Sequence, residues 1–420
     1  ADEWIKPSKL SFSQILIPTS DSTRAEYLIK KISTLPKIRS EQRGEKGVRS
    51  SLIVGGTGTA KTSCALMYAN KFDSNHMLFK NINFSSATTP KMFQDAIDGE
   101  IEKKQGKIFC PPGGRKMTVF VDDMSMPLVN EWGDQVTLEI FRQLIEQEGY
   151  YFLSKENIGD FKVVNDLQFL GAMSHPGGGR NDIPNRIKRF FFAFNMTSPS
   201  VRSIENIYGR ILTVLFNPKK YSQEVIATKD ILTDATINLW DLVRKKLLPT
   251  PTKFHYVFNI RELSRVFQGI CTVAQQPEYK VIQNCLNAPG KMKSEHFLVA
   301  LWRHECERVF EDKLLNYEDK KVFHDFMDKV TIDKFKDHLD VSEEEVLTDF
   351  HFCDFQRGDV YDEYGDMISE APFVYEAAPS LEAIRKIVYE KLASYNETYP
   401  STAMNLVIFD DALRHLLRLC

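Results

Sequence analysis

One eight-residue segment constrains the fold more than any other part of the chain. Residues 55–62 read Gly-Gly-Thr-Gly-Thr-Ala-Lys-Thr, directly after the apolar run 51–54 and directly before residues 63–72, which have helical character. A glycine-rich loop between a buried strand and a helix is the P-loop arrangement of α/β proteins with a parallel sheet. The segment therefore predicts both an α/β fold and a phosphate-binding site.

Each residue type in this loop suits the binding of a nucleoside triphosphate. Glycines let backbone N–H groups fold around phosphate oxygens, Lys61 reaches the outer phosphates, and Thr62 ligates Mg²⁺. Ala60 departs from the pattern, which usually has glycine before the lysine, and its methyl group would be strained at positive φ. A glycine-rich turn with a surface lysine is the alternative. The predicted nucleotide-binding residues are Gly55, Gly56, Thr57, Gly58, Thr59, Ala60, Lys61 and Thr62.

Two adjacent carboxylates form a second candidate motif. The apolar run 117–121 ends in Asp122 and Asp123, which resembles a Walker B element. Asp122 would then hold the Mg²⁺ shell, and Asp123 would stand where a glutamate usually orients the attacking water. Aspartate is one methylene shorter, and a misplacement of about 1 Å can slow a reaction roughly 10²-fold, so slow hydrolysis is predicted. Alternatively, the two acids only cap the end of a strand.

The apolar pattern changes near residue 200. Before it, short apolar runs alternate with helical stretches, as in a parallel sheet covered by helices. After it, the periodicity is helical. We expect an α/β nucleotide-binding subdomain at 1–198, an all-helical lid at 199–310 and a connecting or interaction region at 311–420. The expected strands are 51–54, 78–84, 117–121, 167–172 and 190–194, with a hairpin of 150–153 and 161–164. The expected helices are 23–35, 63–72, 134–146, 206–215, 233–248, 260–274, 294–310, 381–396 and 403–419.

Composition excludes several classes of protein. The 54 basic and 57 acidic residues give a formal net charge of −3, which does not suit a general nucleic-acid binder. No apolar run approaches the length of about 18 residues that spans a membrane, and no signal peptide is recognisable. Seven scattered cysteines without a Cys-x-x-Cys pair predict a reduced, cytoplasmic chain. The first residue is not Met and the last residues are still helical in pattern, so we expect a piece of a longer polypeptide.

Five segments together resemble the third AAA+ module of axonemal dynein heavy chains. The resemblance implies an AAA+ P-loop NTPase, binding ATP or ADP with Mg²⁺ as a slow or regulatory switch in microtubule-based motility. It also implies contact with neighbouring AAA+ modules, dynein intermediate and light chains and, indirectly, microtubules, in the cytoskeleton of the ciliary or flagellar axoneme. No nucleic acid or membrane is implied. The segments are 83–90, 119–127, 130–135, 175–184 and 258–268, and residues 404–413 resemble the lead into the next module.

The resemblance also implies two sensor residues. Ser174 ends the fourth expected strand, where this family places its first sensor, usually an asparagine that contacts the γ-phosphate. Serine is shorter, which again predicts slow turnover, and an ordinary loop serine is the alternative. Arg261 opens a lid helix at the position of the second sensor, where it could couple phosphate charge to domain closure. A solvated surface arginine is the other interpretation.

Two further sites follow from the same resemblance. Arg189, or as a second choice Arg186, precedes the last strand, where AAA+ rings present an arginine finger in trans to the preceding module's nucleotide. A solvated basic face is the alternative. Ile17 and Pro18 resemble the loop that packs on adenine, although either could belong to the core.

Competing functions remain open at this stage. A non-hydrolysing structural nucleotide site is the main alternative to a slow switch. A metabolic P-loop kinase or GTPase would need an acceptor pocket or a guanine-selecting Asn-Lys-x-Asp motif, and the sequence contains no such motif. The histidines show no spacing typical of a zinc site.

Overall fold

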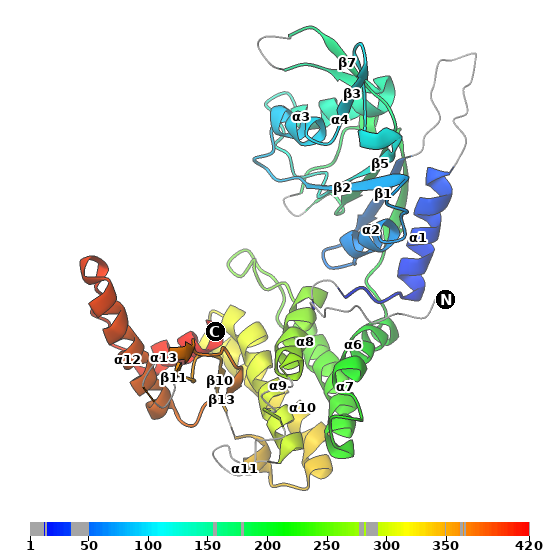
Figure 1. Cartoon of the computed structure of the whole chain (residues 1–420). Coiled ribbons are helices and arrows are strands. Elements are labelled where there is room, and N and C mark those ends of the chain that lie inside the picture. Colours follow the sequence, from blue (N-terminus) through cyan, green and yellow to red (C-terminus); the bar gives the residue numbers. More distant parts are fainter. Residues whose placement is uncertain are drawn as a thin grey trace. The chain divides into compact units, whose positions relative to one another are not determined.

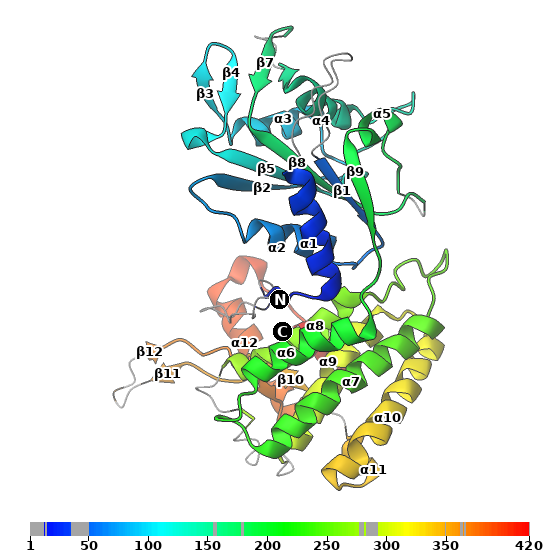
Figure 2. The same ribbon diagram turned by 90° about the vertical axis from the view of Figure 1, so that its right-hand side faces the viewer.

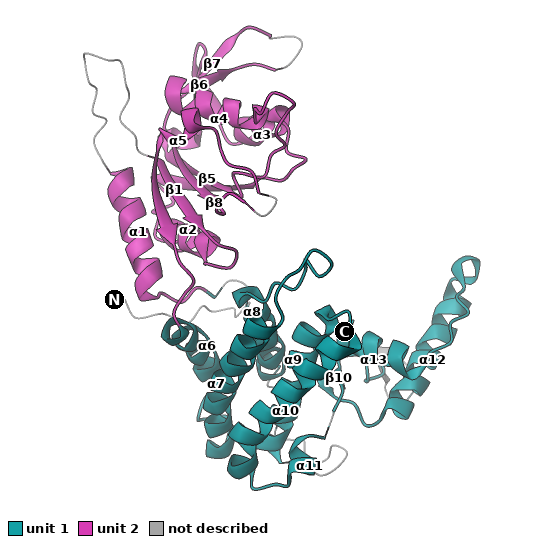
Figure 3. Ribbon diagram, turned by 180° about the vertical axis from the view of Figure 1, so that it is seen from behind, with its two compact units in different colours: residues 1–15, 201–420 teal, residues 16–200 magenta. Residues whose placement is uncertain are grey.

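The computed structural model describes residues 12, 15–34, 50–153, 158–177, 180–276, 281–282, 293–348, 350–361, 364 and 367–419. The chain divides into two compact units, which Figure 3 colours separately: Leu16–Ser200, and Ala1–Ile15 together with Val201–Cys420. The division lies close to the boundary expected at residues 198 and 199. Each unit is described separately below.

The first unit is built on a five-stranded sheet in the order β2-β5-β8-β1-β9, and all neighbouring strands are parallel. All five expected strands and the parallel sheet are confirmed. Successive side chains of a strand belong to different hydrophobic clusters on the two faces of the sheet: Leu52 packs with α3 and α4, and Ile53 packs with α1 and α2. Helices therefore cover both faces, which explains why these strands are apolar throughout. The strands are β1 Ser50–Gly55, β2 Met77–Asn83, β5 Lys116–Asp122, β8 Leu167–Met173 and β9 Phe191–Met196.

Five helices belong to this α/β unit, and the expected helices 23–35, 63–72 and 134–146 are among them. The helix after the P-loop begins at Lys61, two residues earlier than expected, and ends at Ala69. Figure 1 shows α1 and α2 beside each other, and α3 lies with α4 on the other side of the sheet. The helices are α1 Ser20–Ser33, α2 Lys61–Ala69, α3 Pro90–Asp98, α4 Val136–Gln147 and α5 Asn185–Lys188.

A second, four-stranded sheet has the order β3-β4-β7-β6. Its β6–β7 hairpin, Gly149–Tyr151 and Phe161–Val164, was expected and is confirmed. The hairpin of β3, Glu102–Gln105, and β4, Ile108–Cys110, was not predicted. All four residues of β3 are exposed and all four are polar or charged, so the strand has no apolar alternation to detect. Figure 2 shows this sheet at the end of the unit remote from α2.

The second unit begins with a helical bundle. The expected helices are confirmed, but α7 begins at Gln223, ten residues before the predicted start, because Ser222 caps it. A further helix, α10, was not predicted: its buried Phe323, Met327 and Val330 have helical spacing within a highly charged stretch. It packs on α7 and α9, so the packing of the bundle continues past residue 310. The helices are α6 Val201–Leu215, α7 Gln223–Lys246, α8 Ile260–Gln275, α9 Ser294–Phe310 and α10 Tyr317–Leu339.

The remaining elements form two small antiparallel sheets and three helices. Ser342 caps α11 through a capping box with Glu345. The last helix begins at Asp410, so the predicted start at 403 was wrong. The helices are α11 Glu343–Val346, α12 Leu381–Thr398 and α13 Asp410–Leu419, and the strands are β10 Phe352–Cys353, β11 Val360–Tyr361, β12 Met367–Ser369 and β13 Glu376–Ala377.

Candidate functional site

The predicted site lies at the carboxyl edge of the parallel sheet. The P-loop follows β1, Asp122 is the last residue of β5, and Ser174 follows β8 directly. These three strands are neighbours in the sheet, in the order β5-β8-β1, and parallel strands end at the same edge. Three motifs that are far apart in the sequence therefore meet in one place.

The P-loop is a strained turn. Ala60 has φ 62° and ψ 27°, the left-handed conformation that the sequence identified as awkward for a side chain. This conformation costs an L-residue about 1–2 kcal/mol. At Gly55 a Cβ would come within 2.5 Å of the Met196 carbonyl oxygen, so glycine is required there. Close packing thus explains Gly55, whereas Ala60 is tolerated at the expense of backbone strain.

The side chain of Lys61 is buried inside the loop. Its Nζ donates hydrogen bonds to the carbonyl oxygens of Gly55, at 3.0 Å, and Gly56, at 2.8 Å. The hydroxyl of Thr59 also donates to the Gly56 carbonyl, at 3.0 Å. Lys61 is the first residue of α2, so its ammonium group lies beside the positive end of a helix. The arrangement gathers positive charge at the loop where phosphates would bind.

Thr62 and Asp122 join the two motifs. The Thr62 hydroxyl donates to Oδ2 of Asp122 at 2.5 Å, and the backbone N–H of Asp123 donates to Oδ1 of the same carboxylate at 2.9 Å. Hydroxyl and carboxylate oxygens are ligands that suit Mg²⁺, which typically takes only one or two carboxylates and completes its shell with water and phosphate. Within the part of the chain that the structure describes, no group of three or more His, Cys, Asp or Glu could hold a metal alone. The donor set fits a magnesium–nucleotide complex.

Asp123 follows in a left-handed conformation, with φ 50°. Aspartate tolerates this region better than most residues, because its short side chain can bond to nearby backbone. The next residues are fixed by backbone bonds from Met124 N–H to the Ala172 carbonyl, at 2.9 Å, and from Met126 N–H to the Asp123 carbonyl, at 2.9 Å. The position of this carboxylate is therefore set by a constrained turn rather than by a flexible loop.

Ser174 is buried and accepts a hydrogen bond from the Nη1 of Arg180. The Nη2 of the same guanidinium donates to the hydroxyl of Thr57 in the P-loop, at 3.3 Å. Arg180 lies in the segment quoted for the family resemblance, but no role was predicted for it. The signal was available: an arginine follows a Pro-Gly-Gly-Gly run at the end of a strand that neighbours the P-loop strand.

The two candidate arginine fingers lie elsewhere in the unit. Arg189 pairs with Glu146 at 2.5 Å, and Arg186 pairs with Asp134 at 2.6 Å and with Glu139 at 2.7 Å. All three acids lie in α4 or just before it, so both arginines tie the α5 region to α4. Neither side chain forms a hydrogen bond with the P-loop among the described residues, and a role in trans stays a prediction.

The remaining predicted residues lie on other elements of the chain. Ile17 is buried and Pro18 is exposed, both just before α1. Arg261 is exposed at the start of α8 in the second unit, and its backbone N–H donates to Oδ1 of the capping Asn259 at 2.7 Å. Arg261 is thus the one predicted site residue that belongs to the helical unit.

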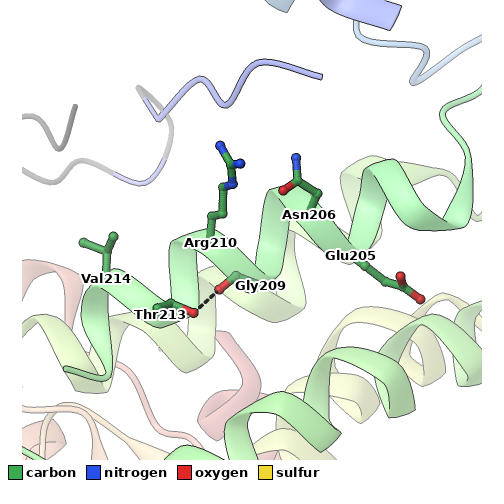
Figure 4. Close-up of a pocket in the computed structure, with 6 residues that line it drawn as sticks. All are labelled: Glu205, Asn206, Gly209, Arg210, Thr213 and Val214. Carbon is green, nitrogen blue, oxygen red and sulfur yellow. Dashed lines mark hydrogen bonds between the residues drawn. The ribbon is translucent and has the colours of Figure 1, made fainter. Parts of the chain in front are cut away.

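Two other features of the chain lack the character of a phosphate site. A pocket of about 340 Å³ runs along α6, as Figure 4 shows, and contains none of the predicted residues. Arg210 is its only basic side chain, so it lacks the phosphate-binding character of the P-loop. In α2, burial raises the pKa of the Cys64 thiol to about 12, which makes it an unreactive core residue. The pocket is lined by Glu205, Asn206, Gly209, Arg210, Thr213 and Val214.

Comparisons with known proteins agree with this arrangement. A family model of the P-loop containing dynein motor region matches residues 4–199, and a model of the AAA+ lid domain matches residues 232–349. The flagellar outer-arm dynein gamma chain of Chlamydomonas reinhardtii is 40% identical over 423 residues, covering 99% of this chain and 9% of the relative. Dynein axonemal heavy chains 8 and 5 of Mus musculus are each 39% identical, over 412 and 427 residues, covering 97% and 99% of this chain and 8% of each relative.

The chain thus spans less than a tenth of the length of each of these three curated relatives. None of the helices in the described ranges combines the length and the apolar character that crossing a membrane requires.

Proposed function

The chain belongs to the dynein motor region family of AAA+ P-loop proteins, and from this premise we propose that it binds ATP and ADP with Mg²⁺ as a slow or regulatory nucleotide switch. In this proposal the chain is the third AAA+ module of an axonemal dynein motor. Its neighbours are the other modules of the same heavy chain, and its setting is the ciliary or flagellar axoneme.

The contact between Thr62 and Asp122 carries the proposal. It joins the end of the P-loop to the end of β5 across 60 positions of sequence, at 2.5 Å. A hydroxyl at the start of α2 and a carboxylate on the neighbouring strand end are the two groups that P-loop NTPases use to hold Mg²⁺ at the phosphates. With Lys61 directly before Thr62, the chain supplies the cation, the metal ligands and the helix terminus that a triphosphate needs.

Three features support slow rather than fast hydrolysis. Asp123 is short and its backbone is fixed in a turn, so its carboxylate has limited reach toward an attacking water. The Ser174 hydroxyl, at the position of the first sensor, already accepts a hydrogen bond from Arg180. Third, neither of the two candidate fingers, Arg186 and Arg189, contributes to this site, because both pair with acids of the α4 region. An arginine finger can contribute roughly 10³ to 10⁵ to the rate.

A purely structural nucleotide site is the second candidate, and the same engagement of Ser174 favours it. In that case bound nucleotide would stabilise the fold without turnover. The dynein role, in which nucleotide state alters the angle between the α/β unit and the lid, requires that ATP and ADP be distinguished.

The test is calorimetric binding of MgATP and MgADP to the unaltered chain, followed by single-turnover measurement of phosphate release. We expect both nucleotides to bind and phosphate to be released slowly. Fast steady-state release by the chain alone would overturn the slow switch. Binding without any release over many hours would favour the structural site, and failure to bind either nucleotide would overturn the proposal.

A further inference from the structure

We propose that Arg180 recognises the terminal phosphate of ATP in cis, and that Ser174 positions this arginine rather than contacting the phosphate itself. The inference rests on the proposed function, because it requires nucleotide in the P-loop. It assigns to one side chain the distinction between ATP and ADP.

Position is the first argument. Arg180 Nη2 donates to the Thr57 hydroxyl at 3.3 Å, although the two residues are 123 positions apart. Thr57 is an exposed residue in the middle of the P-loop. The guanidinium therefore lies at the open side of the loop that would hold the phosphates, and a bound phosphate would compete with a neutral hydroxyl for it.

Anchoring is the second argument. The Nη1 of Arg180 donates to the hydroxyl of Ser174, which is buried at the end of β8. The backbone of Arg180 is held as well: its N–H donates to the Gly177 carbonyl at 3.2 Å, and the Gly177 N–H donates to the Arg180 carbonyl at 3.1 Å. Gly177 has φ 115°, a conformation for which glycine is suited. A side chain held at both its backbone and its tip is ordered before the ligand arrives, which lowers the entropy cost of binding.

Charge is the third argument. Arg142, Arg186 and Arg189, in the same unit, each pair with a carboxylate. Within the described ranges Arg180 has no such ion pair, and its side-chain partners are two hydroxyl groups. Its positive charge is thus left uncompensated next to a phosphate loop. A guanidinium has five donors in a planar fork that matches phosphate oxygens, whereas serine could offer a single neutral hydroxyl.

The combined geometry explains how a chain with serine at the first-sensor position can still read the γ-phosphate. Ser174, at the end of β8, holds the guanidinium in place, and Arg180 has the longer side chain and the positive charge that contact with the phosphate requires. ADP lacks the phosphate that Arg180 would contact, so only ATP should gain from this residue.

The test compares affinities for MgADP and for a non-hydrolysable ATP analogue with Mg²⁺ on the full chain, by calorimetry. Arg180→Ala should lower the affinity for the ATP analogue about 10- to 100-fold, the range of a charge-assisted hydrogen bond. The affinity for ADP should change less than about threefold, within the scatter of a lost neutral contact. Arg180→Lys should retain part of the preference for ATP, because the charge remains and the fork is lost.

Arg115→Ala is the matched control. Arg115 also donates two side-chain hydrogen bonds, to the backbone carbonyls of Pro112 at 3.0 Å and Ser74 at 3.3 Å, but it lies at the start of β5, away from the carboxyl edge of the sheet. It should leave both affinities unchanged. Since both ligands are measured on one preparation, partial misfolding of a variant cancels in the ratio of affinities.

A double-substitution cycle tests the positioning role of Ser174. Ser174→Ala alone should reduce the ratio of ATP to ADP affinity less than Arg180→Ala, and it should have no further effect when Arg180 is already alanine. Equal losses for both nucleotides in Arg180→Ala, or an unchanged ratio, would overturn this inference alone. Failure of the unaltered chain to bind either nucleotide would overturn the proposed function, and this inference with it.

Discussion

The two units of this chain use ionisable side chains in opposite ways. In the α/β unit, Lys61 and Lys162 are the buried charged residues among those described. The carboxylates and the arginine of its site are only partly buried, at the edge of the sheet. In the helical unit, one helix, α9, buries Arg303, His304 and Glu305 in its middle.

The buried charges of α9 connect helices and strands to one another. Arg303 donates to Asp328 of α10 at 2.9 Å. Glu305 accepts from the Tyr375 hydroxyl at 2.6 Å and from Arg308. Burial raises the pKa of Glu305. Such shifts are often taken as signs of a catalytic site, but Glu305 is held by Tyr375 and Arg308 within the packing of this unit.

The same α9 region binds the end of the chain. Arg418 of α13 pairs with Glu307 at 3.2 Å and with Glu311 at 3.1 Å. These acids lie on the last turns of α9 and just after it. Buried charge in this unit therefore marks structural joints between elements distant in sequence.

Backbone strain, unlike buried charge, coincides with the candidate site in the α/β unit. Ala60 and Asp123, at the candidate site, both have positive φ without being glycine. In the described part of the helical unit, Asp340 at the end of α10 is the non-glycine residue with positive φ. Strain at a strand end, together with convergent polar groups, is the better indicator of function here.

The largest effect is expected at the phosphate loop. Lys61→Ala should lower the affinity for both ATP and ADP by about 100-fold or more, because a charge-assisted contact to phosphate is lost from a site that is otherwise unchanged. Calorimetry measures the affinity, and circular dichroism checks the fold. Lys71→Ala, which removes an exposed ion pair with Glu26, is the control. Unchanged affinity in folded Lys61→Ala would show that this loop is not the phosphate site.

The helical unit should respond to pH through His304. Neither ring nitrogen has a hydrogen-bond partner among the described residues, and burial lowers the pKa of His304 from 6.5 to about 3, with His351, Arg418 and Arg308 adding to the shift. Between these values the unfolded chain binds a proton that the folded chain does not. The contribution of His304 to the free energy of unfolding is therefore fully present above about pH 6.5. It falls as the pH decreases, by at most about 1.4 kcal/mol per pH unit.

Replacing His304 should make the free energy of unfolding depend less on pH. We expect His304→Leu to lose less stability between pH 6.5 and pH 5 than the unaltered chain, as measured by urea unfolding followed by tryptophan fluorescence. Glu305, whose raised pKa gives a slope of opposite sign, is present in both proteins and cancels in the comparison. His415→Leu, an exposed position on α13, is the control. Parallel pH profiles for His304→Leu and the unaltered chain would contradict the prediction.

A matched pair of glycine substitutions compares strain in the two units. Ala60→Gly and Asp340→Gly each relieve a left-handed residue and should raise the free energy of unfolding by about 0.5–1 kcal/mol, with the smaller gain at Asp340 because aspartate tolerates this region better. Denaturant unfolding measures both. Nucleotide affinity should change only in Ala60→Gly. If Asp340→Gly altered it equally, the strain at Ala60 would have no special connection with the site.

The smallest effect concerns the candidate finger. Arg189 is 57% exposed and its pair with Glu146 lies at the surface, so Arg189→Ala should cost less than about 1 kcal/mol of stability and leave nucleotide binding by this chain unchanged. In a longer stretch of heavy chain, the same variant should impair the nucleotide site of the preceding module. Occupancy of both sites, measured together, separates the outcomes. If Arg189→Ala weakened nucleotide binding only at this chain's own site, Arg189 would act in cis. If neither site responded, Arg189 would be part of a solvated basic surface without a role in nucleotide binding.

The sequence by itself determined the α/β class, the five parallel strands and the P-loop with its paired carboxylates. These features depend on local chemistry: apolar runs buried on both faces, a glycine run between strand and helix, and acids at a strand end. It also located the change to helices near residue 200. It did not reveal β3 or α10, because the exposed, polar surface of β3 and the many charges of α10 obscure their patterns.

Tertiary structure alone decided which polar residues meet. Only the order β5-β8-β1 brings Thr62 to Asp122, and only the backbone turn at Gly177 directs Arg180 toward both Ser174 and Thr57. It also decided that Arg189 pairs with Glu146. Side-chain partners across 43 to 123 positions of sequence depend on strand order and on how the helices pack, and neither is encoded in any single local pattern.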